Sequence, residues 1–251
     1  MIAILIYARN FVLARLFALL TVALCVENAS AAIYLSEPFD YPAGNLSTAT
    51  PWAGAGSNLK LISGNLTNSQ LTAFSPVNDT KAQCTGSAAD GKRTFNATEV
   101  GSPATGGSIY VSFLMRQTTL AAGSGPLLAL SDSTSVGSGG TGALVVYLNK
   151  SGTQFQVGVK KNGSTVQYPA SGTYSVNDTV LVVARYKFNN SSTNDDTVTL
   201  WINPVLNGVE PAPGPTGISE TTVAATTDFS HRPAISSSAR QLFDGRRGKR
   251  S

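Results

Sequence analysis

Cysteine and histidine are scarce in this chain, which contains two cysteines and one histidine in 251 residues. Cys25 lies in an N-terminal segment that we expect to be removed, so Cys84 is left without a partner for an internal disulfide. The fold must therefore rest on a hydrophobic core. His231 is the one possible base for a serine triad, and no nucleophile-elbow motif accompanies it. Catalysis of that type is not expected.

An excess of charge of one sign is also missing from most of the chain. The formal net charge is +4, but residues 32–239 carry eleven basic and twelve acidic groups, and the basic surplus lies mainly in residues 240–251. Because no basic stripe is available to neutralise a phosphate backbone, nucleic acid is not expected as a partner. We expect the basic tail to be solvated, with binding to an anionic cell surface as the alternative.

Long hydrophobic runs are confined to the N-terminus. Leu16–Val26 is apolar, Arg9 and Arg15 precede it, and small residues follow it up to Ala32. This order is typical of a cleaved signal peptide, a signal helix within residues 1–31. A retained membrane anchor is the alternative, since the apolar residues 1–7 lengthen the segment. Arg9, Asn10 and Arg15 interrupt this longer segment well short of the ~20 residues that a span needs. We expect a secreted or cell-envelope protein with no membrane segment after cleavage.

Helical periodicity is lacking as well, and alternation of apolar and polar residues takes its place. Residues 177–204 predict two long strands joined by a polar loop, each with one apolar face. These two strands indicate an all-β, antiparallel fold. The residues expected on the apolar faces are Val180, Val182, Ala184, Tyr186, Phe188, Val198, Leu200 and Ile202.

Shorter alternating segments, bounded by Gly, Ser, Thr and Asn, fill the rest of the chain. Turn signals at Lys150–Gly152 and Asn162–Gly163 predict a three-stranded meander over residues 142–169. We expect one domain over residues 32–204, followed by a Pro-rich connection and a basic tail over residues 205–251. The other predicted strands are Ile33–Ser36, Leu59–Ser63, Ser108–Gln117, Pro126–Ser131, Gly142–Asn149, Thr153–Lys160 and Thr165–Pro169.

Three segments carry a resemblance to a known family: Glu37–Asn45 (EPFDYPAGN), Ser108–Arg116 (SIYVSFLMR) and Asp196–Pro204 (DTVTLWINP). In this order they resemble secreted bacterial proteins with a concanavalin A-like, laminin G-like jelly roll. The resemblance implies an antiparallel jelly-roll β-sandwich of two curved sheets. The chain departs from the family pattern after Phe243, where basic residues replace a final strand. A truncated or frameshifted final strand would leave one sheet edge unpaired.

Glycan-active enzymes of similar fold require residue patterns that this sequence does not contain. Sugar hydrolysis usually needs two carboxyl groups about 5 to 10 Å apart, and the Glu-x-Asp-x-x-Glu motif of jelly-roll glucanases is absent. None of the four glutamates after residue 32 pairs with another acid at the i, i+2 spacing. A resemblance to polysaccharide lyases would require Arg, His and Tyr on one sheet, but His231 lies outside the predicted strands. We expect no enzymatic activity.

The strand faces opposite the core offer a candidate ligand site. An exposed Trp or Tyr ring can stack on a sugar, and amides, hydroxyls and guanidinium groups can bond its hydroxyls. We predict a glycan-binding face centred on Trp201; the alternative is that loops cover this face and Trp201 packs beneath them. The candidate residues are Tyr110, Arg116, Gln154, Gln156, Arg185, Thr199, Trp201 and Asn203.

A second candidate is the polar loop that joins the two long strands. Asn189, Asn194, Asp195 and Asp196 offer the hard oxygen ligands that calcium prefers. The spacing is not that of an EF-hand, and the same residue types are common in hairpin loops. No cofactor is expected, with calcium at this loop as the alternative.

These patterns together predict a secreted, non-catalytic module for recognition or adhesion at the cell envelope. Its expected partner is a glycan or a cell-surface polysaccharide. The alternatives are a structural surface protein without a small ligand and a glycan-active hydrolase or lyase. Clustering of the polar strand faces in an open groove would favour binding, and a flat or loop-covered sheet would favour a structural role. Two acids that face each other in a cleft would favour catalysis.

Overall fold

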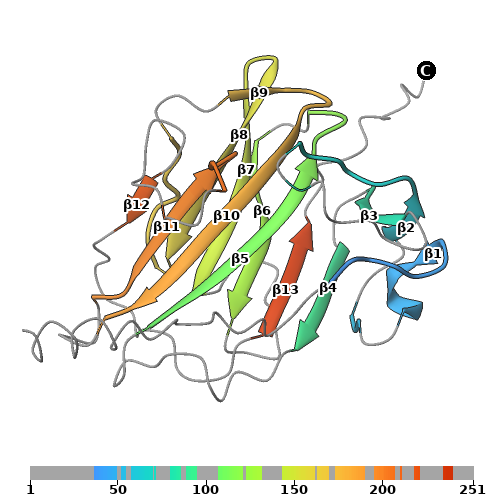
Figure 1. Ribbon diagram of the computed structural model, residues 1–251, viewed down its shortest axis with the longest axis horizontal. Coiled ribbons are helices and arrows are strands. Elements are labelled where there is room, and N and C mark those ends of the chain that lie inside the picture. Colours follow the sequence, from blue (N-terminus) through green and yellow to red (C-terminus); the bar gives the residue numbers. More distant parts are fainter. Residues whose placement is uncertain are drawn as a thin grey trace, which may run out of the picture. The chain divides into compact units, whose positions relative to one another are not determined.

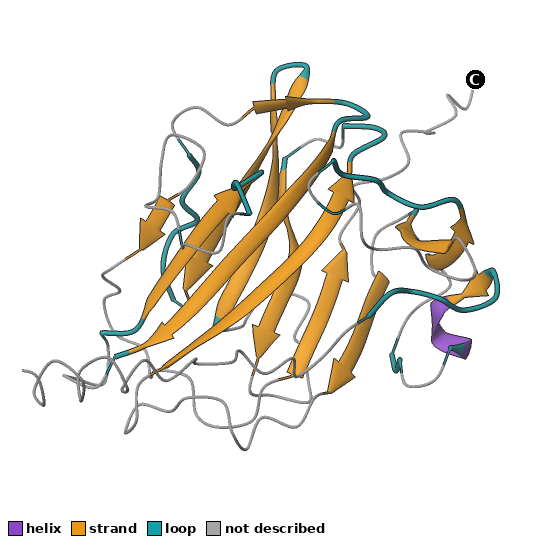
Figure 2. Ribbon diagram, viewed as in Figure 1, coloured by secondary structure: helices purple, strands orange, loops and turns teal. Residues whose placement is uncertain are grey.

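The structure, a computed structural model, consists almost entirely of strands where it forms regular elements (Figure 2). The chain divides into two units, residues 1–34 and 35–251. The structure describes part of the second unit. The predicted signal helix and the predicted strand Ile33–Ser36 lie outside the described residues. Those residues are 37–49, 52–54, 58–69, 71, 80–85, 89–94, 107–120, 123–131, 143–161, 163–169, 173–189, 195–206, 210, 218–220 and 234–239.

One sheet has four antiparallel strands and contains the predicted long hairpin. Its order is β12-β11-β10-β5, with β5 at one edge. The hairpin of residues 177–204 is formed by β10 and β11, which pair from Val182 with Ile202 to Lys187 with Thr197. Figure 1 shows β5 and β10 side by side along their whole length. The strands are β5 (Gly107–Arg116), β10 (Thr179–Phe188), β11 (Thr197–Ile202) and β12 (Ile218–Glu220).

A second antiparallel sheet has six strands in the order β4-β13-β6-β7-β8-β9. Strands β7 and β8 form the predicted hairpin, but the segment expected as the third strand of the meander makes only one bridge, between Gln167 and Val159. It lies against Gly158, where an added Cβ would stand 2.6 Å from the Tyr168 ring. The strands are β4 (Ala89–Thr94), β6 (Ser124–Ser131), β7 (Leu144–Ser151), β8 (Gln154–Lys161), β9 (Thr173–Ser175) and β13 (Ala234–Ala239).

One apolar cluster joins the four-stranded and the six-stranded sheet. It takes alternate residues from strands of both sheets, so the two sheets pack face to face. Leu144, Val146 and Val157 come from the six-stranded sheet, and Val182 and Leu200 from the four-stranded sheet; all five are fully buried. The alternation read from residues 177–204 therefore identifies the core face. No helix in the described part of the chain is long and apolar enough to cross a membrane.

Strands of the two large sheets lie beyond residue 204, where the sequence pattern placed the end of the β domain. Strand β12 extends the four-stranded sheet, and β13 lies between β4 and β6 in the six-stranded sheet (Figure 1). Segment 234–239 is rich in serine and lacks strong apolar alternation, so periodicity could not reveal it. Its pairing partners, which are distant in sequence, supply the backbone hydrogen bonds that define it as a strand.

A third sheet of three short strands has its own small core. The order is β1-β2-β3, with β1 (Gly44–Asn45), β2 (Leu59–Ser63) and β3 (Thr80–Cys84), and a short 3-10 turn, η1 (Leu46–Thr48), follows β1. Leu46, Leu61 and Trp52 are buried together with Cys84, which forms no disulfide. A bridge between Ala53 and Lys92 connects this part of the chain to β4.

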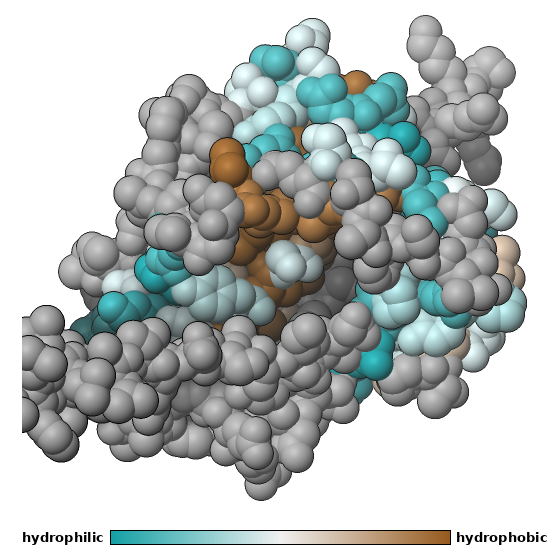
Figure 3. All heavy atoms as spheres, viewed as in Figure 1, coloured by the Kyte–Doolittle hydropathy of each residue, from teal (hydrophilic) through white to brown (hydrophobic). Residues whose placement is uncertain are grey.

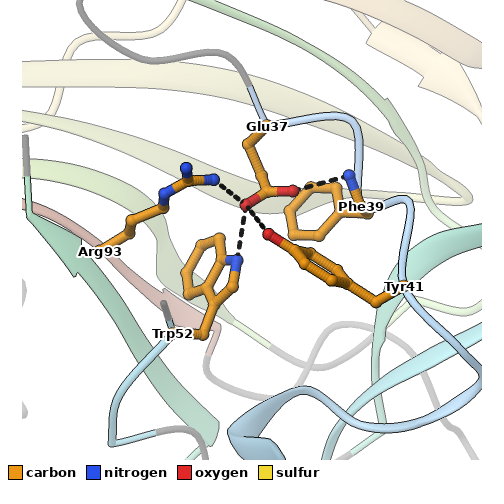
Figure 4. A network of polar contacts seen from close by, with 5 residues as sticks. All are labelled: Glu37, Phe39, Tyr41, Trp52 and Arg93. Carbon is orange, nitrogen blue, oxygen red and sulfur yellow. Dashed lines mark hydrogen bonds and ion pairs between the residues drawn. The ribbon is translucent and has the colours of Figure 1, made fainter. Parts of the chain in front are cut away.

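Glu37 is the centre of a polar network beside this small core (Figure 4). Its carboxylate accepts hydrogen bonds from the Phe39 backbone N–H at 2.7 Å, from Trp52 Nε1 at 2.7 Å and from the Tyr41 hydroxyl at 3.1 Å. It also forms an ion pair with Arg93 of β4. The Phe39 and Trp52 rings stack with centroids 5.6 Å apart. Glu37 therefore links the residues before β1 to the edge of the six-stranded sheet.

We predict that Glu37→Ala lowers the free energy of unfolding by about 3 kcal/mol, because it leaves a largely buried guanidinium and an indole N–H without their acceptor. Denaturant unfolding measures the loss. Glu37→Gln is the matched variant, which retains an amide oxygen as acceptor and should lose less. Equal stability of wild type and Glu37→Ala would contradict this role.

Candidate functional site

Three of the candidate residues form one row across the outer face of the four-stranded sheet, the face opposite the core. Arg185 of β10 lies between Tyr110 of β5 and Thr199 of β11, and each is a direct cross-strand partner of Arg185. Directly opposite residues on one face of an antiparallel sheet are near enough for their side chains to interact. The alternation in each strand and the antiparallel register together produce this row.

Glu210 adds a carboxylate to the row. Its two oxygens accept hydrogen bonds from the Tyr110 hydroxyl and from Arg185 Nη1, the second contact being an ion pair. Arg185 Nη2 donates to Thr199 Oγ1 at 3.0 Å. We call Tyr110, Arg185, Thr199 and Glu210 the outer-face row. Sequence reasoning missed Glu210 because it stands in an irregular Pro-rich connection, where no periodicity assigns it to a face.

Trp201 lies beneath Arg185. Its side chain is only 4% exposed, and the Arg185 guanidinium carbon is 5.4 Å from the centre of the ring. At this distance the contact is a cation–π interaction. A sugar could not stack on a ring in that position, so the arrangement matches the alternative in which Trp201 is covered. In the structure, the Trp201 ring contacts the Arg185 guanidinium and helps to hold it in position.

Among the described residues of this face, Tyr110 is an exposed aromatic. It is 53% exposed, although its hydroxyl is bonded to Glu210. On the same face Ser108, Ser112 and Lys187 are exposed, and Val183 is half-buried. Figure 3 shows apolar side chains gathered near the middle of the view, with hydrophilic residues around them. An accessible ring therefore lies beside fixed polar groups.

Two further candidates lie on this face but away from the row. Asn203 directly follows β11 and has a positive φ of 50°, and its side-chain Oδ1 accepts a hydrogen bond from the Leu181 N–H at 2.8 Å. That oxygen serves to close the end of the hairpin. Arg116 is half-buried at the far end of β5, opposite Thr179. It lies about 20 Å along the strand from Tyr110.

Gln154 and Gln156 belong to the other sheet. They alternate along β8 with Phe155, Val157 and Val159, whose side chains face the core. Both glutamines thus point to the outer side of the six-stranded sheet, with the core between them and Tyr110. They cannot join the outer-face row, because packed sheets lie about 10 Å apart and the glutamines point away. The alternation within each strand was readable, but the sheet to which each strand belongs was not.

The hairpin loop holds its acidic residues in hydrogen bonds with the protein. The Asp196 carboxylate accepts from the Tyr186 hydroxyl at 2.6 Å and from the Asn189 N–H at 2.7 Å, and Asp196 is 1% exposed. Its backbone oxygen accepts from Lys161 Nζ at 2.9 Å. Asn189 Nδ2 donates to the Asp195 carbonyl oxygen, and Asn194 lies outside the described residues. In the described ranges no group of three acidic, histidine or cysteine side chains is arranged as a metal site.

The protonation behaviour of Tyr110 bears on the chemistry available at the row. Partial burial and the hydrogen bond to Glu210 raise the pKa of Tyr110, although Arg185 acts in the opposite direction. A raised pKa makes a phenol a poorer general base at neutral pH. Glu37 and Glu210, the glutamates whose side chains are described, lie in separate networks. The outer-face row can donate hydrogen bonds to a ligand and present the Tyr110 ring to it.

Comparisons with known proteins give no family for this chain. No family model and no curated protein matches it. A solved carbohydrate esterase from the Shiga toxin-encoding bacteriophage phi24B is 14% identical, with a TM-score of 0.39 over 77% of this chain and 90% of that one. A protein of unknown function from Shewanella oneidensis MR-1 is 14% identical, with a TM-score of 0.36 over 74% of this chain and 73% of the other.

We predict that Asp196→Ala lowers the free energy of unfolding by about 3 kcal/mol, since the buried Tyr186 hydroxyl and the partly buried Asn189 N–H lose their acceptor. Calcium and a chelator should leave the Tm of the wild type unchanged. The matched control is Asp178→Ala, which removes an exposed carboxylate that accepts from the Ser175 N–H; it should cost less than about 1 kcal/mol. A calcium-dependent rise in Tm that Asp196→Ala abolishes would favour a metal site instead.

We also predict that four tyrosines lose their protons at a higher pH in the folded protein than in the unfolded chain. Burial raises the pKa of Tyr41, Tyr110, Tyr168 and Tyr174 above the ordinary value of 10.0. The unfolded chain therefore loses these protons first, and the free energy of unfolding falls as the pH rises above about 10. Absorbance titration of native and denatured protein measures the difference. Coincident curves would contradict it.

Proposed function

We propose that this chain is a secreted, non-catalytic recognition module that binds carbohydrate on the outer face of its four-stranded sheet. The observation that carries the proposal is the position of Tyr110, a residue that is 53% exposed, beside the hydrogen-bonded Arg185. Sugars present apolar C–H faces that an exposed aromatic ring can cover. Their hydroxyls can pair with guanidinium and hydroxyl groups. In this proposal Tyr110 takes the central position that the sequence had given to Trp201.

The preset position of Arg185 supports the proposal. Thr199 and Trp201 hold the guanidinium in one place before any ligand arrives. A group that is already ordered loses less conformational entropy on binding. Tyr110 lies on β5, and its ring can turn about only two side-chain torsions. Both features favour the recognition of a rigid ligand such as a sugar ring.

The proposal also includes a fold class and a cellular location for this protein. Two antiparallel sheets over one core support a jelly-roll sandwich related to secreted concanavalin A-like or laminin G-like proteins. The N-terminal sequence supports export to the cell envelope or beyond. The raised pKa of Tyr110 and the separate networks of Glu37 and Glu210 support binding rather than catalysis.

A structural surface protein without a small ligand is the competing function. It is favoured by the contact of Glu210 with Tyr110 and Arg185, because that contact also anchors the connection after β11 to the sheet. In that case the outer-face row would hold the chain together and contact no ligand. Binding measurements on variants of Tyr110 distinguish the two.

We predict that Tyr110→Ala weakens binding to a glycan selected on an array by about tenfold. Tyr110→Phe keeps the ring and should retain most of the affinity. Because the ring is exposed, the Tm of both variants should stay close to that of the wild type. Lys150→Ala, an exposed position on the other sheet, is the control. An array without signal for the wild type, or equal binding by Tyr110→Ala, would reject the proposed site.

A further inference from the structure

Glu210 holds its carboxylate where an acidic ligand would place its own. The Tyr110 hydroxyl and Arg185 Nη1 both donate to it, on the accessible face of the sheet. We propose that the ligand of this site is an acidic glycan, whose carboxylate displaces that of Glu210 from Arg185 and Tyr110. The inference rests on the proposed function and extends it by naming the ligand class and an internal competitor.

The charges near the row favour an anion. Arg185 and Lys187 are successive outward positions of β10, about 7 Å apart along the strand. Lys187 is exposed, whereas Arg185 is half-buried. A uronic acid unit at Arg185 would leave Lys187 within reach of the next acidic unit of the same chain. Complementary charge of this kind raises both the association rate and the specificity of binding.

Arg185 keeps its orientation when Glu210 leaves. Its Nη2 donates to Thr199, and its guanidinium carbon lies 5.4 Å from the centre of the Trp201 ring. Of the Arg185 contacts described, only the one from Nη1 changes partner, and the Tyr110 hydroxyl changes partner with it. The guanidinium group is well suited to carboxylates because its donors form a rigid, planar fork. Thr199 and Trp201, both buried, therefore act as positioning residues for the cation.

A ligand carboxylate can replace that of Glu210 at Arg185. The Glu210 side chain is 38% exposed, in contrast to the 11% of Glu37 in its network with Arg93. Solvent-exposed ion pairs add little net stability, because water competes for both charges. Glu37 also accepts from Trp52, Tyr41 and Phe39, which ties it to the protein more firmly. Of the two carboxylates, Glu210 is the exchangeable one.

The experiment compares acidic sugars with their neutral forms. The probes are oligosaccharides of galacturonate, alginate and hyaluronan, each beside its carboxyl methyl ester, and the proteins are the full secreted chain and its variants. Titration calorimetry gives the affinities. We expect the wild type to bind at least one acid more tightly than its ester. Glu210→Gln, which keeps the shape but not the charge, should bind that acid about two- to fivefold more tightly, with little change toward the ester.

Variants of the cations complete the design. Arg185→Gln should lose the preference for the acid. Lys187→Gln, at an exposed position of β10, should weaken the preference and reduce its sensitivity to salt. Lys150→Gln, an exposed lysine on the other sheet, should change nothing. Thermal melting checks that each variant is folded. Loss of the acid preference in Arg185→Gln and its weakening in Lys187→Gln, together with the gain in Glu210→Gln, support the inference.

Three results would overturn the inference of an acidic ligand. Equal binding of acid and ester, no binding of any acid, or no gain in Glu210→Gln would show that Glu210 only anchors the connection to the sheet. If binding of a neutral glycan is still lost in Tyr110→Ala, the proposed carbohydrate site stands and only the acidic ligand class fails. If no glycan binds and Tyr110→Ala changes nothing, the proposed function fails as well.

Discussion

Burial of one apolar face from each of the two large sheets is the constraint on which the rest of the structure depends. Each strand of the central hairpin directs its alternate residues into the shared core, and Val182, Leu200 and Val157 have no exposed surface there. Because the side-chain period of a strand is two, the same packing fixes every residue of the opposite set outward. The outer-face row therefore exists because the core does. In the part of the chain that the structure describes, no disulfide supports it, since the buried Cys84 is not in one.

Polar groups with similar chemistry serve different purposes in this molecule, and their burial separates them. The carboxylates of Glu37 and Asp196 are enclosed, and each accepts hydrogen bonds from two or more protein donors. Leaving such donors unpaired would be costly, which makes these residues part of the framework. The Glu210 side chain is 38% exposed and contacts groups on an accessible face. Exposure, rather than residue type, marks it as the carboxylate that can exchange partners.

The sequence predicted the local elements well and their long-range arrangement less well. The predicted strand Leu59–Ser63 is β2, and those over 108–117 and 153–160 differ from β5 and β8 by single residues. In contrast, β13 was missed because its serine-rich sequence gives no apolar period. Residues 165–169 were predicted as a strand and form one bridge, since Tyr168 instead packs against Gly158. Tertiary contacts decided both cases.

The candidate site divides in the same way. Alternation alone placed Tyr110, Arg185 and Thr199 opposite the core, because strand geometry is local and a period of two is visible in the letters. Only the tertiary structure separated Gln154 and Gln156 from them, buried Trp201 beneath Arg185 and brought Glu210 to the row. Which strands share a sheet, and which loop crosses a face, depends on contacts between residues far apart in the chain. No pattern within a single segment contains that information.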